Sequence, residues 1–137
     1  MEDGIADWLT QARQDISSAE NTMASGSYEW ACFIAQQGAE KAVNALYQKL
    51  QVVPYGHDVA ELLRALINRV LIPDEVMADA RALDRYYNHR RYPDKYSEAA
   101  PGDHFTMHDA NEAIGCGKRI LQFCESESGP RKRLLEA

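Results

Sequence analysis

The sequence predicts an all-α fold, an antiparallel bundle of about five helices with an up-and-down core. Three observations predict it: apolar residues recur at three- and four-residue steps, no stretch shows a strand signal, and the breaks between apolar stripes are short. A chain of 137 residues can bury one core of its own. We therefore expect a single helical domain over residues 1–126 and a flexible tail over residues 127–137.

The first two predicted helices are separated by a glycine. Gly26 suits the left-handed conformation that ends many helices, and Ser27 can cap the next helix by accepting a backbone N–H. The stripe of the first helix comprises Ile5, Trp8, Leu9, Ala12, Ile16, Ala19 and Met23. The second helix, about residues 28–50, is the most apolar and is expected to be the spine of the core, with Trp30, Phe33, Ile34, Ala42, Val43, Leu46 and Leu50.

The third predicted helix follows the break "QVVPYG". Asp58 is its expected N-cap, with Glu61 three residues on in a capping-box arrangement. Its apolar stripe consists of Val59, Leu62, Leu63, Leu66, Ile67 and Val70.

The last two predicted helices also have clear starting signals. Pro73 suits the first position of the fourth helix, which should end before Pro93 because residues preceding proline avoid the α region. Thr106 with Asp109 can form a capping box for the fifth. The inward-facing residues are Val76, Ala80, Leu83 and Tyr87 in the fourth helix, and Ala110, Ala113, Ile114, Gly117, Ile120, Leu121 and Cys124 in the fifth.

Composition excludes several classes of function. A net charge of −6 argues against general binding to nucleic acid, so any anion site must be local. No Walker A sequence, dinucleotide-binding glycine motif or nucleophile elbow occurs, and the three cysteines lack metal-ligand spacing. We expect no cofactor and no metal. The acidic N-terminus and the lack of a long apolar run favour a cytoplasmic protein without membrane contact.

One stretch stands out chemically, "RALDRYYNHRRYPDKY", residues 81–96. On a helix, Arg81, Arg85 and His89 share one face at four-residue steps. Arginine suits phosphate and histidine can move a proton, so Arg85 and His89 are the catalytic candidates if the protein is an enzyme. The candidate phosphate- or nucleotide-binding residues are Arg81, Arg90, Arg91, Tyr92 and Lys95.

The alternative interpretation of this stretch is structural. Its cations can be neutralised by acids nearby in the sequence, and tyrosines near a helix end often pack against the core. The acids in question are Glu75, Asp79, Asp84 and Asp94.

Polar residues inside the apolar second helix predict a supporting network, because an unsatisfied buried polar group costs about 1–3 kcal/mol. We expect Glu40 to bond either His57 or an arginine of the fourth helix. The network residues are Gln37, Glu40, Lys41, His57 and Asp94.

Three segments together resemble the HEPN domain family (higher eukaryotes and prokaryotes nucleotide-binding): "DWLTQARQDISSAENTMASGSYEWACFIAQQGAEKAVNALYQKLQV", "HDVAELL" and "DRYYNHRRYPD". The resemblance implies an all-α bundle that is usually a homodimer. Many small members are paired with a minimal nucleotidyltransferase in two-gene, toxin–antitoxin-like modules. The residues that carry the resemblance are Trp8, Ala12, Tyr28, Ala31, Phe33, Gln37, Glu40, Lys41, Ala42, His57, Asp58, Leu62, Leu63, Tyr87, Arg91, Tyr92, Pro93 and Asp94.

Ribonuclease members of the family carry an arginine, four to six further residues, and a histidine. Here three residues separate Arg85 from His89 and seven separate Arg81 from His89, so the catalytic motif is not matched. The resemblance therefore implies a nucleotide- or RNA-binding subunit, or a nucleotidyltransferase partner. One alternative is a metal-independent endoribonuclease using the Arg/His pair, and a second is a non-catalytic helical assembly module.

Overall fold

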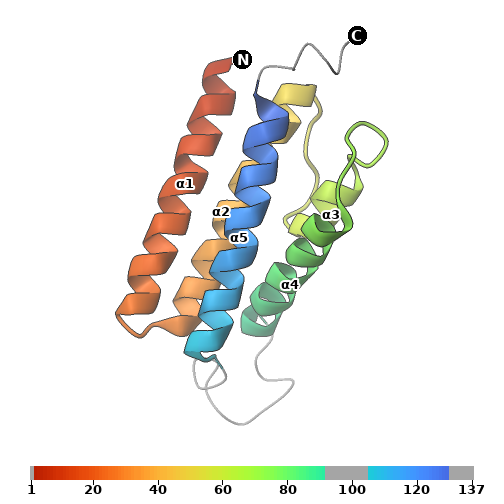
Figure 1. Ribbon diagram of the computed structural model, residues 1–137. Coiled ribbons are helices and arrows are strands. Elements are labelled where there is room, and N and C mark those ends of the chain that lie inside the picture. The colour runs from red at the N-terminus through yellow and green to blue at the C-terminus, as the bar shows by residue number, and fades with distance from the viewer. Residues whose placement is uncertain (1, 92–104, 130–137) are drawn as a thin grey trace.

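The structure is a computed structural model that describes residues 2–91 and 105–129. For residues 2–3 and 88–91 it describes the backbone only. These ranges contain α1 (Glu2–Ala24), α2 (Tyr28–Leu50), α3 (Val59–Arg64), α4 (Asp74–Arg91) and α5 (Met107–Ser128). No strand occurs within them, which confirms the all-α prediction (Figure 1).

The helices form one bundle in which α2 and α5 are central. Helix α1 packs on one side of this pair, and α3 and α4 pack on the other (Figure 1). α1 and α2 run antiparallel through the turn at Gly26, whose φ of +91° lies in the left-handed region that glycine tolerates best. α4 and α5 are also antiparallel (Figure 1). The last turn of α4 therefore lies at the same end of the bundle as the start of α2.

Close helix packing at the centre depends on two glycines. The side chain of Ile16, from α1, reaches the backbone of both central helices at these points. A Cβ built on Gly117 of α5 would lie 2.8 Å from Cδ1 of Ile16, and one built on Gly38 of α2 would lie 3.2 Å from the same atom. Neither position has room for a larger residue without a shift of its neighbours.

One of the predicted helix starts is confirmed in full, and three others differ from the prediction in detail. Thr106 and Asp109 form the expected capping box, with Asp109 N–H donating to Thr106 Oγ1 at 3.1 Å. Ser27 and Asp58 occupy the N-cap positions of α2 and α3, but neither side chain makes a capping bond. Pro73 precedes α4 rather than occupying its first position, because α4 begins at Asp74.

Two apolar residues that were expected in the core are exposed. Trp30 is 48% exposed at the start of α2, and Ile67 is 57% exposed because α3 ends at Arg64, before that residue. At the other end of the chain, α5 continues to Ser128, so residues 127–128 of the expected tail are helical. Residues 130–137 lie outside the described residues.

Candidate functional site

Two arginines lie on the solvent face of α4. Arg81 and Arg85 are exposed and one turn apart, whereas Ala80 and Leu83 face the core. Neither arginine makes a hydrogen bond or ion pair with another described residue. No described residue therefore neutralises their guanidinium groups.

The other residues predicted for this site can be placed less fully. His89, Arg90 and Arg91 belong to the last turn of α4, for which only the backbone is described. Tyr92, Asp94 and Lys95 lie outside the described residues.

The structural alternative, in which nearby acids neutralise these cations, is wrong for two of the four acids. Asp79 instead binds Arg119 of α5 through two bonds, from Nε at 2.8 Å and from Nη2 at 3.0 Å. The hydrogen bond to Asp79 raises the pKa of Arg119 above its ordinary value. Asp79 therefore joins α4 to α5. Its carboxylate is bound by Arg119, so it does not neutralise Arg81 or Arg85.

Asp84, the second acid, caps a different helix. Its buried carboxylate accepts the backbone N–H of Val59 at 2.9 Å and of Ala60 at 2.8 Å, so an α4 side chain satisfies the first amides of α3. Burial raises the pKa of Asp84, and the hydrogen bonds from Ala60, Val59 and Gln36 oppose that rise.

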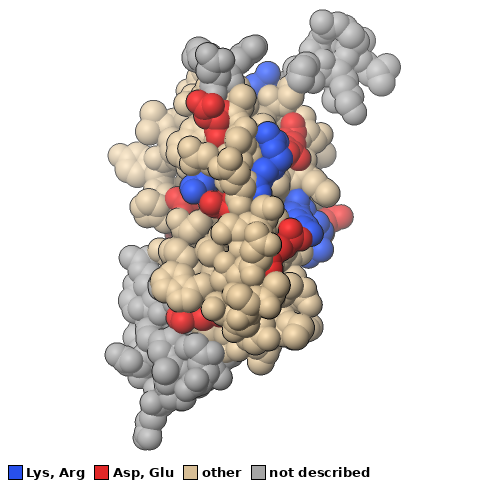
Figure 2. Space-filling view, turned by 90° about the vertical axis from the view of Figure 1, so that its left-hand side faces the viewer, with Lys and Arg blue, Asp and Glu red and all other residues tan. Residues whose placement is uncertain are grey.

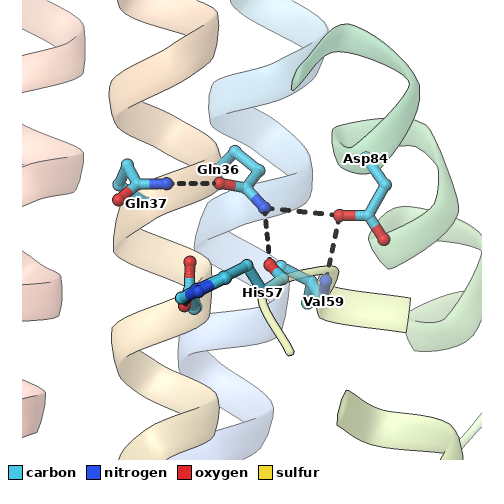
Figure 3. A network of polar contacts seen from close by, with 6 residues as sticks. Gln36, Gln37, His57, Val59 and Asp84 are labelled. Atoms are coloured by element: carbon cyan, nitrogen blue, oxygen red, sulfur yellow. Dashed lines mark hydrogen bonds and ion pairs between the residues drawn. The ribbon is translucent and has the colours of Figure 1, made fainter. Parts of the chain in front are cut away.

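The polar network continues from Asp84 into α2 (Figure 3). Gln36 Nε2 donates to Asp84 Oδ1 at 3.4 Å and to the carbonyl of His57 at 3.2 Å. Gln37 Nε2 donates to Gln36 Oε1 at 2.7 Å, and Glu40 Oε2 lies 3.0 Å from His57 Nδ1. The expected contact between Glu40 and His57 is therefore present.

The residues of the network differ in part from those predicted. Lys41 was expected to join it but pairs with Asp15 of α1 at 2.8 Å. Gln36 and Asp84, which the sequence prediction left out, are its central members. The signal for Gln36 was its place on the apolar face of α2, where an amide must find partners.

Three aromatic rings adjoin the network on α2 and α4. Phe33 stacks on Tyr87 with ring centroids 5.8 Å apart and planes 17° apart, and Trp30 meets Phe33 edge-on at 5.7 Å. Because Trp30 is half exposed, this aromatic group (Trp30, Phe33 and Tyr87) reaches the surface near the last turn of α4.

The opposite side of the molecule carries mixed charges. Figure 2 shows the side bearing α1, where basic and acidic residues alternate over the surface. Several are paired across helices: Arg13 with Glu125, and Glu20 with Lys118. This side therefore offers no basic patch of the kind that binds nucleic acid.

A pocket of about 280 Å³ lies at the other end of the bundle, between α1, the end of α2 and residues 52–54. Its lining has no charged side chain, so it is unsuited to phosphate. The lining residues are Trp8, Asn44, Tyr47, Gln48, Val52, Val53 and Pro54.

Two kinds of feature do not occur among the described residues. No group of three or more potential metal ligands is found among them. None of the described helices combines the length and the hydropathy that a membrane crossing requires.

Comparisons with known proteins identify the fold family. No curated protein matches the chain. Among solved structures, the chain is similar to TT1696 from Thermus thermophilus, with a TM-score of 0.84 and 37% identity over 90% of this chain and 97% of that one. It is also similar to ST0689, an archaeal HEPN homologue, with a TM-score of 0.78 and 37% identity over 91% and 98% of the two chains.

A third similar structure is an HEPN domain protein from Thermotoga maritima, with a TM-score of 0.72 and 31% identity over 88% of this chain and 95% of that one. The sequence model of the HEPN domain matches residues 5–127. The chain therefore belongs to the HEPN domain family.

Proposed function

We propose that this HEPN chain is a binding subunit that takes a phosphate-bearing ligand, a nucleotide or single-stranded RNA, on the solvent face of α4. The observation that carries the proposal is the pair Arg81 and Arg85, exposed and one turn apart, while Asp79 and Asp84 are held by other groups. A guanidinium group binds phosphate through two parallel hydrogen bonds, which suits such a pair.

The acidic balance of the chain makes this binding local. With a net charge of −6, the protein as a whole repels a polyanion, so affinity must come from the few cations at the end of α4. The neighbouring aromatic group can add stacking of bases, worth about 1–3 kcal/mol per base. We therefore expect modest, strongly salt-dependent binding.

Binding is tested with a fluorescein-labelled single-stranded RNA, followed by anisotropy in EDTA over a series of salt concentrations. Replacing Arg81 and Arg85 together by glutamate should weaken binding more than tenfold. It should also reduce the salt slope by about 1.4, since each phosphate contact on a single strand contributes about 0.7.

The matched control replaces Arg64 and Arg69 together by glutamate, which makes the same charge change at two exposed arginines, at the end of α3 and in the segment between α3 and α4. If the variant at positions 81 and 85 binds RNA no more weakly than this control, the α4 face is not the binding site.

A second role, as a dimer and as the partner of a nucleotidyltransferase in a two-gene module, is favoured by the aromatic group. Trp30 is 48% exposed at the surface, and large exposed aromatic residues are typical of protein interfaces. Trp30→Asp should therefore lower the molar mass measured by light scattering, or abolish co-purification with a co-expressed minimal nucleotidyltransferase. Ile67→Asp, at another exposed apolar residue, is the control.

Cleavage of RNA is a separate activity with its own test. It is favoured by the register of α4, in which His89 follows Arg85 by one turn on the same helix. A metal-independent ribonuclease would cut single-stranded RNA in EDTA, and His89→Ala would abolish cutting. Intact RNA after long incubation with excess protein would exclude this alternative.

A further inference from the structure

The contact between His57 and Glu40 sets the chemistry of the imidazole ring. Glu40 Oε2 lies 3.0 Å from His57 Nδ1, and the side chain of Glu40 is only 14% exposed while that of His57 is 76% exposed. A carboxylate can only accept a hydrogen bond, so Nδ1 must carry the hydrogen. In the neutral ring, Nε2 is then an acceptor. The structure thus presents an oriented proton acceptor at the surface.

The backbone beneath this ring is held from two sides. Gln36 of α2 donates to the carbonyl of His57 at 3.2 Å, and two residues later the N–H of Val59 is bound by Asp84 of α4 (Figure 3). Val59 follows His57 by two residues and is bonded to Asp84. Asp84 in turn directly precedes Arg85 in α4. The imidazole and the proposed phosphate-binding face are positioned by one shared network.

The surroundings of His57 decide which ligand group it can meet. The carboxylate of Glu40, from α2, lies 3.0 Å from the ring. Two further acids are near it in the chain, Asp58 directly after His57 and Glu61 in the first turn of α3. The carboxylate of Asp84, from α4, is instead bonded to the backbone of Val59 and Ala60. The Glu40 carboxylate beside the ring disfavours a phosphate at this point, and it is compatible with a neutral hydroxyl that donates to Nε2.

The same face of α2 carries groups suited to a nucleoside. Phe33, stacked on Tyr87, precedes Glu40 by seven residues, or two helical turns, which is about 10 Å along the axis. Gln37 lies between them. Rings for a base and an acceptor for a sugar hydroxyl are thus arranged along one helix face.

We propose that His57, oriented by Glu40, is a specificity-determining residue for ribose, in which Nε2 accepts the hydrogen bond of a ligand hydroxyl. The surface then takes ribonucleotides in preference to deoxyribonucleotides, since the 2′-hydroxyl is the group that distinguishes them. This inference rests on the proposed function, because it names the sugar that the phosphate-binding surface selects.

The test compares labelled single-stranded RNA with DNA of the same sequence, deoxyuridine replacing uridine, in EDTA. At pH 8 the wild-type protein should bind RNA about three- to tenfold more tightly, the range expected for one net hydrogen bond. His57→Ala should lower RNA affinity to that of DNA, and His108→Ala, at an exposed histidine of α5, should keep the preference.

A second measurement determines the tautomer of the His57 ring in the protein without any ligand. Long-range ¹H–¹⁵N NMR spectra of the wild-type protein should show the Nδ1–H tautomer of His57, and Glu40→Gln should shift the population toward Nε2–H because an amide can also donate. A wild-type ring in the Nε2–H form, or one unaffected by Glu40→Gln, would overturn the inference.

The outcomes separate this inference from the proposed function. Equal affinity for RNA and DNA, with both lost in the variant carrying glutamate at positions 81 and 85, overturns the role of His57 and leaves the α4 face standing. No binding of either strand by the wild-type protein overturns both.

Discussion

Asp84 and Val59 are joined by a hydrogen bond that connects two helices: Asp84 Oδ1, from α4, accepts the first backbone N–H of α3 at 2.9 Å. A helix N-terminus leaves four N–H groups without intrahelical partners, and these are usually satisfied by the residue just before the helix. Here the acceptor is 25 residues further along the chain. The position of α3 is therefore set by α4, and this bond connects the segment that bears His57 to the helix that bears Arg85.

Removing this acceptor should destabilise the protein strongly. Asp84→Ala leaves the N–H groups of Val59 and Ala60 without their partner in a buried place, at about 1–3 kcal/mol for each unsatisfied group. The free energy of unfolding, measured by urea denaturation, should fall accordingly.

Asp58→Ala is the matched control, because Asp58 occupies the N-cap position of α3 but makes no side-chain capping bond. It should cost about 0.5 kcal/mol or less, as for other surface substitutions. Equal losses in the two variants would show that Asp84 is not the cap of α3.

The pH dependence of stability should reveal the protonation of Asp84. Burial raises its pKa from 3.8, so the folded state binds this proton more tightly than the unfolded state does. The stability from this group is fully present below the unfolded pKa and is lost as pH rises through the folded pKa. The difference in unfolding free energy between wild type and Asp84→Asn should thus be largest near pH 4 and decrease toward pH 7.

Urea titrations of both proteins at intervals over that pH range measure this difference. A difference that grows with pH would mean that the bonds from Ala60, Val59 and Gln36 outweigh burial and hold the pKa of Asp84 below its ordinary value.

Local signals in the sequence were sufficient for some features whose partners are close in the chain, although the side-chain caps expected from Ser27 and Asp58 are absent. The bounds of α2 and the capping box of Thr106 and Asp109 depend on residues a few positions apart, and both predictions are confirmed. The role of Asp84 as the cap of α3 could not be predicted in this way. In the sequence it lies close to Arg81 and Arg85, which suggests an ion pair, and only the packing of α3 against α4 shows what it binds. Trp30 was wrongly predicted to be buried. Helical periodicity shows which residues share an apolar face, but not whether another helix packs against that face.

For the candidate site, the sequence indicated the face of α4 and the contact between Glu40 and His57. It could not indicate the central place of Gln36 in the network, because this depends on the carbonyl of His57 and on Asp84, 21 and 48 residues away. Side-chain bonds between distant segments are fixed by tertiary packing, which single-sequence patterns do not contain.

The three cysteines should be inert in the folded protein. Burial raises the pKa of Cys32 and of Cys116 to about 12, and raises that of Cys124 as well. Since the thiolate is the reactive form, Ellman's reagent at pH 8 should react slowly with native protein and rapidly with three thiols in urea. Fast reaction of one thiol under native conditions would show that the surrounding helix opens.

The packing of Ile16 on the two glycines gives a prediction for the centre of the bundle. A Cβ on Gly117 would lie 2.8 Å from Ile16 Cδ1 and 3.3 Å from the carbonyl oxygen of Ala35, whereas one on Gly115 meets only the end of Arg119, at 3.5 Å. Gly117→Ala should cost about 1–3 kcal/mol through overpacking. Gly115→Ala should instead stabilise the protein by up to about 1 kcal/mol through helix propensity.

Ile16→Val separates the steric cause from any other effect of the alanine at position 117. It removes Cδ1, the atom that the new Cβ would meet, so the double variant should recover part of the stability that Gly117→Ala loses. By itself, Ile16→Val should cost about 0.5–1.5 kcal/mol, because it empties space in the core. Strictly additive losses in urea denaturation of the two single variants and the double variant would mean that α1 and α5 do not meet at this point.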